Sequence, residues 1–183
     1  SYDDIGFRFN GTSDWHILRM PITLKQVDTD YLLKAFNVYI EPIRYGSIIE
    51  ALMHGFDVLL NQSVGIKLKM YDYTKRPITS DDLKLAKKLN YHLSLSHGSK
   101  ADLFKVAIEL GLNYACSFKL SHNEPLPKTF TYKGITLEVL DGDKTDWRPS
   151  DPSDITRIIG LKHKRTKNQD IKAVEKFCIN TSA

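Results

Sequence analysis

Apolar and polar residues alternate in several stretches of the chain, and this period of two is typical of β-strands. Leu68 and Met70 alternate with Lys67, Lys69 and Tyr71, which predicts a half-buried strand with both lysines on its solvent-facing side. Further strands are predicted at 5–9, 15–22, 91–96, 114–120 and 130–140.

Helices are indicated by apolar residues three and four positions apart and by residues that favour helix ends. Ser47 and Glu50 have the spacing of a capping box, and Gly55 is placed to end that helix. Ser99 precedes a periodic run that Gly111 closes, so we expect Ser99 to cap a helix over 100–110. Further helices are predicted from Asp28 or Asp30 through Phe36, from Ser80 or Asp81 through Leu89, after the acid–proline–acid stretch 151–154, and over 170–177.

This order of elements predicts an α+β fold, with a mixed or antiparallel sheet and helices packed on it. The length of 183 residues suits one domain that buries a sizeable core. We therefore expect a single globular domain over residues 1–183, either as a whole protein or as the trimmed core of a slightly longer one.

Composition narrows the class of protein further. No apolar run approaches the roughly 18 residues of a membrane span, and the first residues do not have the pattern of a signal peptide. Cys116 and Cys178 are the only cysteines, too few for a disulfide scaffold, and Cys116 lies in an apolar run that predicts a buried free thiol. These features predict an intracellular protein in a reducing compartment.

Basic residues gather at two places in a chain of net charge +4. They are the predicted binding residues: Lys67, Lys69, Lys75 and Arg76 in the first group, and Lys162, Lys164, Arg165 and Lys167 in the second. Such groups suit phosphate backbones or acidic lipid, although many ordinary surfaces carry them as well. Tyr71 and Tyr73 alternate with the lysines of the first group, so they could stack on bases or form a subunit contact.

The stretch YHLSLSHGSKADLF, residues 91–104, has the residue types of an active-site or phosphate-binding loop. It carries one glycine rather than the several that let a backbone wrap a phosphate, and the expected cap gives Ser99 a structural role. We therefore interpret it as a strand, a turn and a capped helix. The spacing of His92, His97, Cys116 and His122 matches no compact zinc-ligand pair, and we predict neither metal nor cofactor.

A nuclease is the alternative function. Glu50, Asp57 and Lys69 have the residue types and order of a PD-(D/E)xK site, in which carboxylates hold magnesium and a lysine lies beside the attacking water. The position expected to carry the second acid is Lys67, which would repel the cation. The alternative therefore includes both an active and a degenerate nuclease acting on nucleic acid.

Two segments carry a resemblance to the globular core of rhabdovirus matrix proteins. WHILRMPITLKQVDTDYLLKAFNVYIEPIRYGSIIEALMHGF resembles the first half of that core, and FTYKGITLEVLDGD resembles its late strand with an acidic turn. Together they cover roughly a third of the chain. The chain departs from the family in its helix-rich interval 78–112 and in having no proline-rich late-domain motif.

The resemblance implies a non-enzymatic viral assembly protein that self-associates. Such a protein would bind the nucleocapsid or nucleic acid and make peripheral contact with acidic lipid. It would lie in the host cytoplasm or nucleus and on the inner face of the virion envelope. We expect no small-molecule substrate, and we expect the two basic groups to carry the electrostatic contacts.

Overall fold

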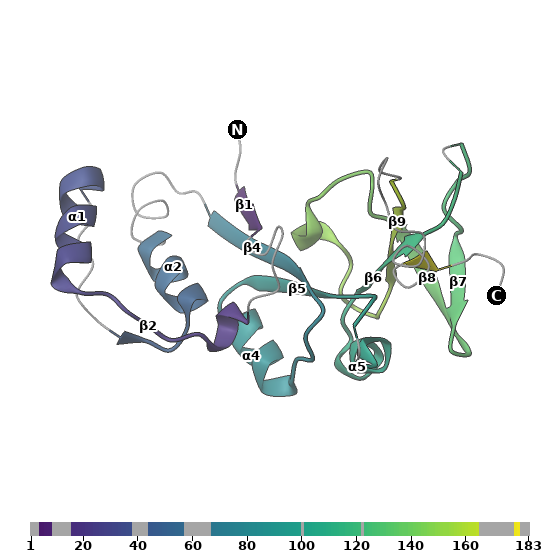
Figure 1. Cartoon of the computed structure of the whole chain (residues 1–183), viewed down its shortest axis with the longest axis horizontal. Helices are drawn as coiled ribbons and strands as arrows, with labels where there is room; N and C mark the ends of the chain where they lie inside the picture. The colour runs from purple at the N-terminus through teal and green to yellow at the C-terminus, as the bar shows by residue number, and fades with distance from the viewer. Residues whose placement is uncertain are drawn as a thin grey trace. The chain divides into compact units, whose positions relative to one another are not determined.

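A computed structural model describes residues 4–8, 16–37, 44–56, 67–99, 101–121, 123–164 and 178–179 (Figure 1). The chain divides into two compact units. The first contains Ser1–Tyr71 and Thr79–His92, and the second contains Asp72–Ile78 and Leu93–Ala183. The prediction of one domain over residues 1–183 stays a prediction.

The predicted α+β class is confirmed, since helices accompany a mixed sheet and a small antiparallel sheet. In the mixed sheet every strand pair with a described register is parallel except β7 with β8, which is antiparallel. The small sheet pairs β2 with β3.

Among its described residues, the first unit contains three α-helices, one 3-10 helix, the small β2–β3 sheet, β1 and most of β4. Its elements are β1 (Asp4–Arg8), η1 (Ile17–Arg19), β2 (Ile22–Thr23), α1 (Gln26–Phe36), β3 (Arg44–Tyr45), α2 (Ile48–Phe56), β4 (Lys67–Thr74, to Tyr71) and α4 (Ser80–Lys88). Ile17 and Ile49 are almost fully buried, and η1 contacts both α2 and α4. The predicted strand over 15–22 is therefore wrong: the apolar pair Ile17 and Leu18 forms a buried 3-10 turn instead.

Polar side chains fix the starts of α2 and α4. Ser47 Oγ accepts a hydrogen bond from Glu50 N at 3.1 Å, as the capping-box spacing predicts. The helix continues one residue past Gly55, which therefore does not end it. Before α4, Thr79 and Asp82 form a reciprocal capping box, which satisfies backbone N–H groups that have no partner within the helix.

The second unit is built on parallel strands in the order β5-β6-β9-β8, with β7 outside β8. Its elements are β5 (Tyr91–Ser96, from Leu93), α5 (Leu103–Leu110), β6 (Tyr114–Phe118), β7 (Thr129–Tyr132), β8 (Ile135–Asp141), η3 (Arg148–Ser150), β9 (Ile158–Lys162) and β10 (Cys178–Ile179), which pairs with β6. The predicted strand at 91–96 is confirmed, and every residue of β6 is buried. β4 neighbours β5 in the sheet, and its last residues, Asp72–Thr74, belong to this unit.

The run 130–140 is a hairpin and not the single long strand that its apolar pattern predicts. Lys133 and Gly134 form the turn, with φ of 50° and 79°. Two consecutive residues of positive φ are what a tight two-residue hairpin turn requires, and Gly134 adopts this conformation without strain. Figure 1 shows β7 and β8 folded back on each other at this turn.

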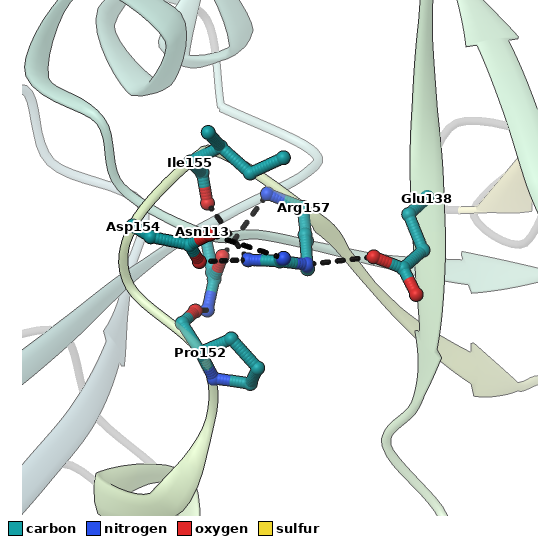
Figure 2. A network of polar contacts seen from close by, with 6 residues as sticks. All are labelled: Asn113, Glu138, Pro152, Asp154, Ile155 and Arg157. Carbon is teal, nitrogen blue, oxygen red and sulfur yellow. Dashed lines mark hydrogen bonds and ion pairs between the residues drawn. The ribbon is translucent and has the colours of Figure 1, made fainter.

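The predicted helix start at 151–154 is also wrong, because the groups that would begin a helix are engaged elsewhere. Asp154 Oδ1 lies 2.5 Å from Arg157 Nη1, and Arg157 Nε donates to Glu138 of β8 at 2.7 Å. Asn113 donates to Pro152 O at 3.1 Å and accepts from Arg157 N at 3.0 Å (Figure 2). This network holds the segment extended as it enters β9. The predicted helix over 170–177 lies outside the described residues.

Aromatic rings form much of the core of the second unit. Phe104 of α5 packs edge to face on Tyr114 and Tyr132, with ring centroids 5.3 and 4.9 Å away. Phe118 and Phe130 form a second such pair at 5.1 Å. The β7–β8 hairpin and α5 therefore meet over β6, and His97 lies at the edge of this cluster.

Candidate nucleic-acid interface

One face of the β1–β4 pair combines basic and aromatic side chains. The two strands are parallel, with Gly6 opposite Lys69 and Arg8 opposite Tyr71, and side chains of opposite residues lie on the same face. Arg8 is exposed, and Lys69 and Tyr71 are half-buried. We call this group, Gly6, Arg8, Lys69 and Tyr71, the β1–β4 face.

The other face of β4 is buried, as the alternation predicts. Leu68 is 7% exposed and Met70 is fully buried. Lys67 also belongs to β4, but its side chain lies outside the described part. Because Gly6 has no side chain, the flank of Lys69 that faces β1 is not covered by that strand.

His92 of β5 adds a neutral ring close to Lys69. Burial lowers the pKa of His92, and the positive charge of Lys69 lowers it further. Its Nε2 is buried and makes no hydrogen bond to any described residue. The ring is therefore uncharged at pH 7, so the positive charge of this region comes from Arg8 and Lys69.

The predicted basic residues outside this face follow the carboxyl ends of strands. Lys75 and Arg76 come directly after β4, and both are exposed. Lys162 ends β9, and Lys164 lies two residues further on. Parallel strands bring their carboxyl ends to one edge of a sheet, which is the common place for ligands in open α/β sheets.

Asp143 offsets part of the charge at the end of β9. Its Oδ2 accepts a hydrogen bond from Lys162 N at 2.7 Å, and its Oδ1 lies 3.8 Å from Lys164 Nζ. The Lys164 side chain is still 86% exposed, so it can contact a partner. Arg165 and Lys167, the other predicted residues of this group, lie outside the described residues.

The turn after β5 carries a histidine with a defined environment. His97 Nδ1 lies 3.0 Å from the Tyr114 hydroxyl, and His97 N donates to Ala115 O at 2.8 Å. Burial lowers the pKa of His97, and Lys75 and Lys133 lower it further. Burial raises the pKa of Tyr114 far above its usual value, so the hydroxyl stays protonated and can donate to a neutral imidazole.

Ser99 does not cap α5, contrary to the prediction. The cap is Asp102, whose Oδ1 accepts from Lys105 N at 3.3 Å, and the helix begins at Leu103. Ser99 Oγ accepts from Ala101 N at 3.2 Å and so closes the turn before the helix. The acid takes the capping position because it directly precedes Leu103, and its Oδ2 also pairs with Lys133 Nζ at 2.7 Å.

The nuclease residues are only partly described. Glu50 Oε2 accepts a hydrogen bond from Gly46 N at 2.8 Å, so its carboxylate helps to fix the start of α2. Lys69 lies on the β1–β4 face, and Asp57 lies outside the described residues. The nuclease alternative stays a prediction.

The described residues contain no group of three histidine, cysteine or acidic side chains that could hold a metal ion. His97 is engaged with Tyr114, and burial raises the pKa of the Cys116 thiol to about 12, which opposes the thiolate that a metal needs. His92 and His122 are the two remaining candidate ligands, and His122 lies outside the described residues.

Sequence reasoning found Lys69 and Tyr71 but missed Arg8 and the surroundings of His97. Arg8 joins the face only because β1 pairs with β4 across a long stretch of chain, and no local pattern encodes that register. Tyr114 and Tyr132 looked like ordinary core residues of alternating strands. The Lys133–Gly134 pair was the available signal for a turn beside His97.

Comparisons with known protein families, with curated proteins and with solved structures find no match for the chain. The resemblance to rhabdovirus matrix proteins therefore stays a prediction. In the part of the chain that the structure describes, no helix has both the length and the apolar character needed to cross a membrane.

Proposed function

We propose that this chain is a non-enzymatic domain that binds nucleic acid, and that the β1–β4 face is its main contact surface. The observation that carries the proposal is the register of β1 on β4, which sets Arg8 beside Tyr71 and Gly6 beside Lys69. Cationic side chains contact phosphates, and a tyrosine ring stacks on a base. The face offers both within two neighbouring strands.

A single strand fits this face better than a duplex. In a duplex the bases are stacked on one another, whereas a single strand exposes base faces to an aromatic side chain. Tyr71 is half-buried, so its position is constrained while part of it stays accessible. The side chains of Arg8 and Lys69 lie on the same face as this ring and would contact the backbone on either side of a stacked base.

The basic residues that follow β4 and β9 in the second unit would add attraction without sequence preference. Lys75, Arg76 and Lys164 are exposed, and charge neutralisation of phosphates supplies most of non-specific affinity. Self-association, a role in virion assembly and contact with acidic lipid are further proposals, supported by the sequence resemblance and by the same basic residues. No observation on the described residues favours the nuclease over binding.

The test is the affinity for a fluorescent single-stranded oligonucleotide, measured by anisotropy. Tyr71→Ala removes a stacking ring and should weaken binding by about tenfold, since stacking contributes ~1–3 kcal/mol per base. Arg8→Gln and Lys69→Gln should also weaken binding. Lys34→Ala, an exposed lysine of α1, is the matched control and should leave affinity unchanged.

Each variant needs an unchanged circular dichroism spectrum and thermal midpoint before its affinity is interpreted. Equal affinities for wild type and all three variants of the face would overturn the proposal. Magnesium-dependent cleavage that is lost in Asp57→Ala would establish the nuclease instead. Tighter binding to acidic vesicles than to oligonucleotide, lost in the same three variants, would assign the face to lipid.

A further inference from the structure

We propose that His97, Lys75 and Lys133 form a phosphate-binding subsite in the second unit. The proposal rests on the proposed function for the source of the phosphate, which is a nucleic-acid strand. It differs from the β1–β4 face in its residues and in its chemistry, because it combines two lysines with a histidine donor. No sequence motif assigns these three residues to one site.

The imidazole of His97 is held in one orientation by its neighbours. Its Nδ1 is 3.0 Å from the Tyr114 hydroxyl, and its ring meets the Tyr132 ring edge to face, with centroids 6.0 Å apart. We assign the Tyr114 hydroxyl as the donor to Nδ1, which leaves the proton of the neutral ring on Nε2. His97 therefore offers an N–H donor whose direction is set before any ligand binds.

Lys133 reaches the same aromatic group from the β7–β8 turn. Its Nζ lies 5.7 Å from the centre of the Tyr132 ring and 2.7 Å from Asp102 Oδ2. The ion pair and the ring hold the ammonium in place. An ammonium carries three protons, so one ion pair leaves donors for a phosphate oxygen.

Lys75 completes the set from the end of β4. It follows β4 by one residue, His97 follows β5 by one residue, and β4 neighbours β5 in the sheet. The positive charge of Lys75 is one of the causes that lower the pKa of His97, in keeping with the neighbouring positions of the two strands in the sheet. The strand ends thus bring a lysine and a histidine donor together.

The charges around His97 favour an anion over a cation or an uncharged ligand. Lys75 and Lys133 are positive and Asp102 is negative, while burial keeps Tyr114 protonated and neutral. A bound phosphate would also favour the protonated form of His97, which adds a further positive charge. Affinity for a phosphodiester, whose charge does not change in this range, should therefore rise at acidic pH as His97 becomes protonated.

The experiment follows the ring signals of isotope-labelled histidine by NMR, with inorganic phosphate as the probe. His97 is assigned by its absence in His97→Gln. Phosphate should shift the His97 signal saturably and raise its pKa, relative to chloride at the same ionic strength. Lys75→Ala and Lys133→Ala should each weaken phosphate binding about tenfold, as expected for loss of a hydrogen bond to a charged group.

A variant that should tighten phosphate binding, rather than weaken it, provides a second test. Asp102→Asn keeps a side chain that can cap α5 but removes the negative charge beside Lys133, so it should tighten phosphate binding. Lys128→Ala and Asp146→Asn, at exposed positions of the same unit, are the matched controls and should leave phosphate affinity unchanged.

A His97 titration that is the same in phosphate and in chloride would overturn the subsite. The subsite would also be overturned if the control variants changed phosphate affinity as much as Lys75→Ala, Lys133→Ala and Asp102→Asn do. The changes would then come from the overall charge of the protein. The β1–β4 face is tested separately, through Arg8, Lys69 and Tyr71. Oligonucleotide binding that persists without any phosphate effect on His97 would remove the subsite and leave the proposed function in place.

Discussion

Gly160 of β9 lies where neighbouring side chains leave no room for a Cβ. A Cβ at this position would lie 2.7 Å from Val139 Cγ1 and 3.2 Å from both Leu126 Cδ2 and Phe118 Cε2. We expect Gly160→Val to lower the free energy of unfolding by about 2 kcal/mol, because an overpacked core must shift its side chains. Urea unfolding measures this loss. Lys128→Ala, at an exposed position of the same unit, is the control, and equal losses in both variants would contradict the prediction.

The two cysteines lie on neighbouring strands but on opposite faces of the sheet. Cys178 pairs with Ser117, so it shares the face of Ser117, and the adjacent Cys116 points to the other face. Both thiols are buried and free, and burial raises the pKa of Cys116 to about 12. The geometry therefore opposes a disulfide between them.

Because only the thiolate reacts, Cys116 should resist alkylation in the folded protein. In a Cys178→Ser variant at pH 8, iodoacetamide should modify no thiol until denaturant is added, and then one. The control is Cys116→Ser, in which the same reaction measures the accessibility of Cys178. Rapid full modification of the folded Cys178→Ser variant would show that Cys116 is not buried as described.

At the scale of single elements, the sequence predicted best where a local pattern and a local cap agree. The strand at 91–96 and the helix after Ser80 follow from alternation and from the acidic first turn, and both are confirmed. The helix ending at Gly111 is confirmed as well, since a glycine at φ 65° suits a left-handed cap.

The elements that failed were decided by tertiary contacts. Ile17 and Leu18 are apolar enough for a strand, but they pack as a 3-10 turn against α2 and α4. The 151–154 stretch has a helix-start signature, yet Arg157 and Asn113 hold it extended. Of the candidate interface, the lysine–tyrosine row of β4 was predictable, while Arg8 depended on a register that sequence alone does not give.

The start of α4 provides a test at this scale. Thr79 Oγ1 accepts hydrogen bonds from Asp82 N at 3.2 Å and from Arg19 Nη2 at 3.0 Å, so its hydroxyl binds both the start of α4 and η1. Thr79→Ala should lower the free energy of unfolding by about 1 kcal/mol, the usual loss for an N-cap. Denaturant unfolding measures it, with Ser80→Ala as control. A loss no larger than that of the control would show that the cap does not stabilise the helix.

For the whole molecule, two kinds of buried group set how stability depends on pH. The pKa values of His92 and His97 are lowered by burial first, so below pH 6.5 the folded chain binds fewer protons than the unfolded chain. Stability should therefore fall as the pH falls through this range. The raised pKa of Cys116 acts in the opposite direction above pH 9, where the unfolded chain loses a proton that the folded chain keeps.

We accordingly expect the urea midpoint to be highest between about pH 6.5 and 9 and to decline on both sides. A His92→Gln, His97→Gln double variant should lose the decline between pH 6.5 and 5, whereas a Cys116→Ala variant should keep it. A wild-type midpoint that rises as the pH drops from 6.5 to 5 would contradict the burial of the two neutral imidazoles.

The central claim is that the molecule binds single-stranded nucleic acid through charge as well as stacking. Its most direct test is the affinity of the wild-type chain for a labelled single-stranded oligonucleotide across a series of salt concentrations. With Arg8 and Lys69 each neutralising one phosphate, the plot of log affinity against log salt should have a slope of about −1.4 or steeper, and Lys69→Gln should make it shallower by about 0.7. A flat plot, or no binding at the lowest salt, would contradict the account.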